Sequence, residues 1–168
     1  MRKVFRAIDA VNEQVGLALR WVVVALVVIC VTEVILRFVF IHPTQQGPHT
    51  MMMVGAALYA LGWGYVYLHD AHVRVDILYA RQSQRGKAII DVVCALLFFF
   101  PMICLVTYGS IHWTWYAWEK GEKLVETFWY PPSAPVRTVV SVGIVLFLFQ
   151  GIVRFIRDLY FAVKGKAL

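Results

Sequence analysis

Glu33 and Arg37 are the residues whose types and spacing are most suited to chemistry, because both lie inside a long apolar run. On a helix, side chains four residues apart share a face and can form an ion pair. An ionisable group inside a membrane span is costly, and it commonly marks a proton or substrate site. Here the arginine favours the ionised carboxylate, which opposes proton exchange. We therefore interpret the pair as structural, fixing helix register or contacting a partner subunit.

A second group of ionisable residues lies between His69 and Asp76. Its two histidines and two aspartates could bind a metal ion, but their spacing alone is weak evidence for a site. The same residues suit a solvated helix start in which Asp70 and Arg74 form a pair. No metal site is predicted.

The five histidines raise the alternative of a haem-binding membrane anchor, which would need opposed axial ligands at one depth. They are His42, His49, His69, His72 and His112. All stand at the ends of apolar runs, so none is placed to oppose another inside the membrane. The loops show no phosphate-binding glycine loop, nucleophile elbow or pair of catalytic carboxylates. Neither a cofactor nor an enzymatic activity is predicted.

Composition decides which elements position these residues. The chain is 61% hydrophobic, whereas soluble domains have roughly 45–50% apolar residues. A membrane span needs about 20 apolar residues, so the 168 residues allow few spans and no large soluble domain. We predict an all-α integral membrane protein, a single domain over 1–168. Its four transmembrane helices are predicted at about 21–41, 50–68, 88–113 and 136–153.

Short interfacial amphipathic helices are predicted beside these spans. Residues 2–19 alternate apolar and charged positions at helical spacing and should lie along the membrane surface before the first span. The connections 69–87 and 119–134 are each long enough to hold a further short helix. Pro101, near the middle of the third span, is expected to kink it.

Lysine and arginine residues fall mainly on one side of the predicted membrane, and cytoplasmic loops hold such an excess. On that side lie Arg2, Lys3, Arg6, Arg20, Arg74, Arg81, Arg85, Lys87, Arg154, Arg157, Lys164 and Lys166. The other side has Lys120, Lys123 and Arg137, offset by Glu119, Glu122 and Glu126. Both ends of the chain are therefore predicted to be cytoplasmic. The net charge of +6 is read as a topology signal and not as a nucleic-acid surface.

The second predicted span has small residues at four-residue intervals, a pattern that lets helix backbones approach closely. The pattern leaves open whether the neighbour belongs to this chain or to another. Taken with the charged residues above, it indicates an interface with a partner subunit. The residues predicted for that interface are Glu33, Arg37, Ala56, Ala60, Gly64, His72, Arg74 and Asp76.

Three segments resemble a known family, the small membrane subunit (DctQ-like) of tripartite ATP-independent periplasmic (TRAP) transporters. Residues 34–40 resemble its V-x-L-R-[YF] end of helix one, and residues 72–78 are similar to its H-[IV]-R-[VI]-D-[LIV] segment. A weaker pattern follows at Gly121, Glu122, Pro135, Gly143 and Gln150. The chain departs from the family before helix two, where residues 44–49 lack the acidic pair that members often have.

The resemblance implies a sodium-driven importer in which a periplasmic binding protein captures a substrate, usually an organic acid, and delivers it to two membrane subunits. It implies that a large multi-span subunit (DctM-like) holds the substrate and sodium sites, while the small subunit is a scaffold in the bacterial inner membrane. The expected partners are the large subunit, the binding protein and membrane lipid.

A self-sufficient proton-coupled multidrug exporter is a further alternative, because small four-helix exporters also use a glutamate in helix one. Arg37 beside Glu33 argues against it, as does the length of the interfacial segments. A single paired charge within the membrane also offers little for a complete translocation path.

Overall fold

The computed structural model describes residues 2–69, 82–125 and 129–165. Its elements are α1 (Arg2–Phe38), α2 (Gly47–Leu68), α4 (Gln84–Cys94), the π-helical turn η1 (Ala95–Phe99), α5 (Phe100–Lys120) and α6 (Ala134–Lys164). Four helices are long and apolar enough to cross a membrane, with α4, η1 and α5 forming one of them. The predicted all-α fold with four spans is confirmed.

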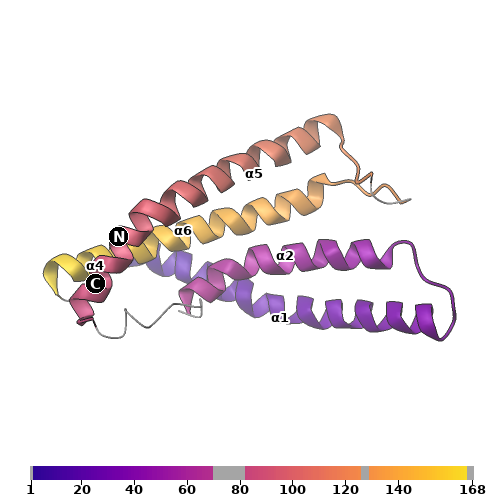
Figure 1. Cartoon of the computed structure of the whole chain (residues 1–168), viewed down its shortest axis with the longest axis horizontal. Helices are drawn as coiled ribbons and strands as arrows, with labels where there is room; N and C mark the ends of the chain where they lie inside the picture. The colour runs from indigo at the N-terminus through magenta and orange to yellow at the C-terminus, as the bar shows by residue number, and fades with distance from the viewer. Residues whose placement is uncertain (1, 70–81, 126–128, 166–168) are drawn as a thin grey trace.

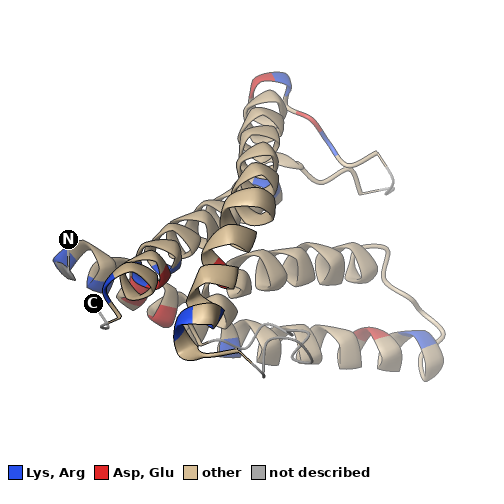
Figure 2. Cartoon of the chain, turned by 60° about the vertical axis from the view of Figure 1, so that its left-hand side comes forward, with Lys and Arg blue, Asp and Glu red and all other residues tan. Residues whose placement is uncertain are grey.

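The helices form two hairpins, α1 with α2 and α5 with α6, which diverge toward the ends that carry their turns (Figure 1). Helix α6 lies between α5 and α2, and it contacts both of them as well as the first half of α1. The beginning of α1 and the end of α6 lie at the same end of the molecule. Charged residues gather mainly at that end and near the two hairpin turns (Figure 2).

Helix α1 is longer than the predicted first span, because it continues without a break from the N-terminal amphipathic segment. Its 37 residues correspond to about 55 Å at 1.5 Å per residue. In the first half, Phe5, Asn12 and Leu19 are buried against the bundle, while Val4 and Val11 are exposed. A helix is thus present over the predicted amphipathic segment, and one of its faces packs on the protein.

The third span accommodates Pro101 without ending. Proline lacks a backbone N–H, and its ring crowds the carbonyl four residues earlier. The π-helical turn ends at Phe99, two residues before Pro101, and Pro101 stands in the first turn of α5. The predicted disturbance of the helix therefore takes the form of one wider turn.

The connection between α5 and α6 differs from the prediction. Among the residues described there, 121–125 and 129–133 form no helix. Gly121 ends α5 in the left-handed conformation (φ 60°), and Lys123 pairs with Pro132 in an isolated bridge. Consecutive prolines cannot donate backbone hydrogen bonds to a helix, which explains the difference. Most of the other long connection, residues 70–81, lies outside the described residues.

Candidate functional site

Glu33 is buried near the turn of the first hairpin, with 7% of its surface exposed. Its carboxylate accepts hydrogen bonds from the backbone N–H of Thr44, at 3.2 Å, and from the Thr44 hydroxyl. The same hydroxyl accepts from the backbone N–H of Gly47, the first residue of α2, at 2.9 Å. Glu33 therefore joins α1 to the turn that begins α2.

The predicted ion pair between Glu33 and Arg37 is wrong. Arg37 is exposed, and no ion pair or side-chain hydrogen bond joins it to any residue that the structure describes. Neutral donors from Thr44 reach the carboxylate because the chain reverses beside it. Arg37 instead stands next to Phe38 and Pro48, at the edge of a shallow groove between α1 and α2.

A polar cluster joins α1 to α6 at the end of the molecule that holds the start of α1. Asn12, which is fully buried, donates to Gln150 Oε1 at 2.9 Å and to the Ile8 carbonyl at 3.1 Å. Gln150 Nε2 donates to Asp9 Oδ1 at 3.0 Å, and Arg157 pairs with Asp9 Oδ2 at 2.6 Å. These bonds hold the amphipathic half of α1 against α6.

Sequence reasoning missed this cluster, although polar side chains inside helices of a membrane protein were a usable signal. Glutamine and asparagine are rare in lipid-facing positions because their amides need hydrogen-bond partners. The resemblance to the family had drawn attention to Gln150 only as part of a pattern. Its partner Asn12 is 138 residues away, a separation that no local pattern can bridge.

The small residues of α2 pack within this chain. Ala60 and Gly64 are buried, and a methyl group added at Gly143 of α6 would lie 2.5 Å from the Ala60 backbone. Gly64 lies against Asn12 in the same close manner. Ala56 is half-buried. The close-packing face is thus present, but α1 and α6 occupy it at Ala60 and Gly64, so another subunit does not contact it there.

Helices α5 and α6 are joined by a seam of hydroxyl groups. Ser141 Oγ lies 2.6 Å from Ser110 Oγ and 2.7 Å from Thr114 Oγ1. Toward the turn, Arg137 forms two bonds to the Glu122 carboxylate, at 2.7 and 2.9 Å. Its guanidinium also lies 4.4 Å from the centre of the Trp113 ring. Hydrogen bonds and an ion pair within the second hairpin therefore hold α5 and α6 together.

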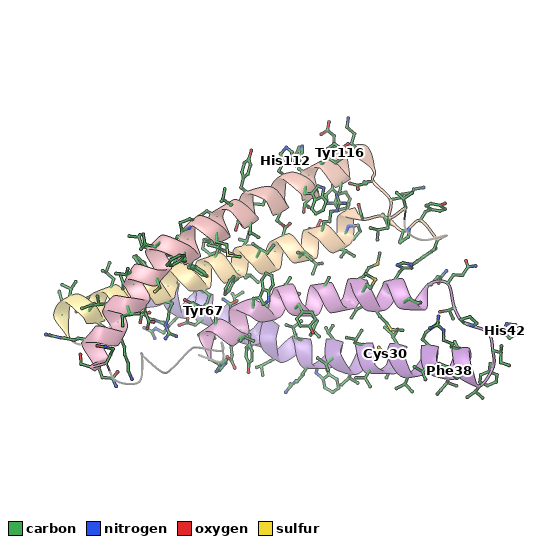
Figure 3. All side chains as sticks on the ribbon, viewed as in Figure 1. Cys30, Phe38, His42, Tyr67, His112 and Tyr116 are labelled. Carbon is green, nitrogen blue, oxygen red and sulfur yellow. The ribbon has the colours of Figure 1, made fainter. Side chains whose placement is uncertain are left out.

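A stripe of exposed apolar side chains runs along α1 and is called here the α1 stripe. It consists of Val24, Val27, Val31, Val34 and Phe38, each at least half exposed. Their spacing alternates between three and four residues, the repeat of helices that pack knobs-into-holes. Arg37 flanks the stripe at the C-terminal end of α1, and Figure 3 shows Phe38 directed away from the bundle there.

The remaining predicted residues contribute less. His72, Arg74 and Asp76 lie outside the described residues. His42 follows α1 and His112 lies on α5, so the structure does not bring these two histidines together (Figure 3). Within the described part of the chain, no three histidine, cysteine, aspartate or glutamate side chains gather as metal ligands would.

Comparison with known proteins supports a transport role. A family model described as "Tripartite ATP-independent periplasmic transporters, DctQ component" matches residues 26–160. The match begins inside α1 and ends near the end of α6, so it covers most of the chain. A search of the curated proteins found no match.

Proposed function

Because the chain belongs to the DctQ family of TRAP transporters, as the match over most of its length shows, we propose that it is the static scaffold subunit of a sodium-coupled importer of organic acids. Members of this family are transporter components and not enzymes, and they work in a tripartite system with DctM and a periplasmic binding protein. The chain itself is a multi-pass membrane protein. The scaffold role, sodium coupling and organic-acid substrate are our proposal.

The buried polar groups support a scaffold that carries no substrate site of its own. Glu33 accepts a hydrogen bond from Thr44, and Asn12 donates a hydrogen bond to Gln150. Transport sites in secondary transporters are commonly built from discontinuous helices whose free ends face the substrate. The four spans are continuous in the parts that the structure describes. These features favour a rigid support beside a moving subunit that holds the substrate and sodium sites.

The observation that carries the proposal is the α1 stripe together with Arg37. Its valines leave a shallow, regular surface that a partner helix can approach, and Arg37 has no acidic partner among the described residues. A guanidinium beside an apolar surface that a partner covers is stabilised by a carboxylate on that partner. We therefore place the large subunit against α1, with an acidic residue of that subunit facing Arg37.

This placement is tested by substituting Val31 at the middle of the stripe. Val31→Trp puts a large side chain at an exposed position, so the isolated chain should still fold while its assembly with the large subunit is lost. Leu105→Trp on α5 is the matched control, because Leu105 is also exposed (73%) and lies outside the stripe. The placement is supported if the large subunit co-purifies with the Leu105→Trp variant and not with the Val31→Trp variant. Equal assembly of both variants contradicts it.

The bacterial inner membrane is the proposed location, with both ends of the chain on the cytoplasmic side. The lysine and arginine residues near the start of α1 and the end of α6 support this orientation (Figure 2), because cytoplasmic segments hold the positive excess. The turn between α5 and α6 then faces the periplasm, where the binding protein acts.

A further inference from the structure

A groove with a volume of about 480 Å³ lies between α1 and α2. Most of its wall consists of apolar and aromatic side chains, among them Leu19, Val23, Leu58, Tyr59 and Trp63. Among the described residues that line it, Arg20 of α1 alone is charged. No residue of the α1 stripe lines this groove. It is therefore separate from the surface that we assign to the large subunit.

Gly62 of α2 leaves the groove open in its middle. A methyl group added at Gly62 would lie 3.8 Å from Leu19 Cδ1, an ordinary contact distance, and a longer side chain would extend into the groove. Gly16 of α1 differs, because a methyl group there would lie 2.0 Å from the ring of Tyr65. The two helices are thus in close contact at Gly16, whereas space remains beside Gly62.

Arg20 has no acidic partner among the residues that the structure describes. Its side chain is exposed, and its guanidinium lies 5.9 Å from the ring centre of the adjacent Trp21, within reach of a weak cation–π contact. Glu13, on the same helix, is bonded to His69 at 2.7 Å. No acidic residue is found among the described residues that line the groove. The groove therefore carries one positive charge that no carboxylate compensates.

This charge lies near the boundary between the hydrocarbon and the headgroups of the membrane. Arg20 precedes Phe38, the last residue of α1, by about 27 Å at 1.5 Å per residue, and the hydrocarbon core is about 30 Å thick. Trp21 is 68% exposed, and tryptophan is enriched at this level. Side chains on a helix lean toward its N-terminus, which for Arg20 is the direction of the headgroups. Val23 and Leu58 lie farther from the chain ends, at the depth of the acyl chains.

We propose that this groove binds an anionic phospholipid, such as phosphatidylglycerol, from the leaflet on the side of the two chain ends. The lipid phosphate lies against Arg20, because a guanidinium can bind phosphate through two parallel hydrogen bonds. One acyl chain enters the groove beside Gly62 and follows Val23 and Leu58. A zwitterionic lipid such as phosphatidylethanolamine brings an ammonium group that meets no carboxylate in the groove, so the anionic lipid binds more tightly.

The test is native mass spectrometry of the purified full chain, titrated with phosphatidylglycerol or with phosphatidylethanolamine. We expect one bound phosphatidylglycerol per chain at concentrations at which phosphatidylethanolamine binds little. Gly62→Leu fills the groove and should weaken phosphatidylglycerol binding about tenfold or more, a loss of about 1.4 kcal/mol. Gly109→Leu on α5 is the matched control, because a methyl group at Gly109 meets nothing within 4 Å and Gly109 does not line the groove. It should leave binding unchanged.

Further arms separate the contribution of the headgroup from that of the acyl chain. Arg20→Gln should weaken phosphatidylglycerol binding about tenfold, whereas Arg6→Gln should not, because Arg6 is exposed on the same helix and does not line the groove. Soluble glycerophosphoglycerol should fail to compete, because it has no acyl chain.

Three results would overturn the lipid site. They are equal binding of the two lipids, unchanged binding by Gly62→Leu or Arg20→Gln, and displacement of the lipid by glycerophosphoglycerol. Loss of the large subunit from Gly62→Leu with lipid binding kept would also overturn it, because the groove then receives that subunit.

Discussion

Gly64 of α2 lies so close to Asn12 of α1 that a methyl group added at Gly64 would be 2.0 Å from Asn12 Oδ1. This contact lets α2 pass over the polar cluster that ties α1 to α6. It places three helices, from both hairpins, in one tightly packed group. For a scaffold that resists movement, we regard this group as the main internal brace.

Gly64→Ala is expected to destabilise the protein by about 1–3 kcal/mol, the usual cost of adding atoms to a close-packed site. Gly55→Ala, in the same helix, is the control, because a methyl group there meets nothing within 4 Å. Thermal unfolding in detergent measures both. Equal melting temperatures for the two variants would show that the brace is absent.

Gln150→Leu tests the hydrogen bonds of the same brace. The change keeps an apolar side chain of similar size, but Asn12 and Asp9 each lose a partner from α6. Leaving buried polar groups unsatisfied costs about 1–3 kcal/mol, so chemical unfolding followed by tryptophan fluorescence should shift by that amount. Gln45→Leu, at an exposed turn position, should change stability little. A Gln150→Leu protein as stable as the parent would contradict a structural role for the cluster.

Glu33→Gln separates a structural glutamate from one that couples proton movement to transport. A glutamine oxygen can still accept the hydrogen bond from the Thr44 backbone N–H, and the amide N–H can donate to the Thr44 hydroxyl in place of the bond that this hydroxyl now donates. We therefore expect assembly with the large subunit to be kept. Sodium-dependent uptake should stay within about twofold of the parent. Normal assembly with abolished uptake would instead identify Glu33 as a coupling residue, as the exporter alternative requires.

Glu122→Gln tests the ion pair between Arg137 and Glu122 near the turn of the second hairpin. Arg137 then loses its charged partner, and we expect a loss of about 1 kcal/mol because the pair is partly solvated. The turn should open roughly fivefold more often, which speeds protease cleavage after the exposed Lys123. Glu119→Gln is the control, since Glu119 is exposed and has no bonded side chain among the described residues.

The same cleavage tests the orientation of the chain. A protease added to the periplasmic face of the membrane should cut after Lys123, while a protease confined to the cytoplasmic face should not. Cleavage from the cytoplasmic face alone would reverse the proposed topology.

The four spans could be predicted from the sequence because apolar runs of sufficient length are decided by local composition. The predicted ends of the spans were less accurate where the local composition does not change sharply. Arg20 marks no clear boundary between the amphipathic segment and the first span, since a single charged residue suits both a surface helix and the end of a span. The extension of α6 to Lys164 was missed for the same reason, because Arg154, Arg157 and Asp158 interrupt its apolar run.

The contacts of the candidate site were less predictable from the sequence, because they depend on which helices pack against each other in the folded chain. The spacing of Glu33 and Arg37 permits an ion pair, but only the folded turn shows that Thr44 reaches the carboxylate first. In the same way, Ala60 and Gly64 mark a packing face, and only the position of α6 shows that this chain fills it. The contact between Asn12 and Gln150 arises entirely from the tertiary arrangement.

The most direct test of the scaffold role is solute uptake into proteoliposomes under a sodium gradient, with the periplasmic binding protein and its organic acid outside. We predict no uptake when this chain is the only membrane protein, and sodium-dependent uptake when the large subunit is added. The Val31→Trp variant should fail to support that uptake, whereas Leu105→Trp should support it. Sodium-dependent uptake by this chain alone would contradict the account.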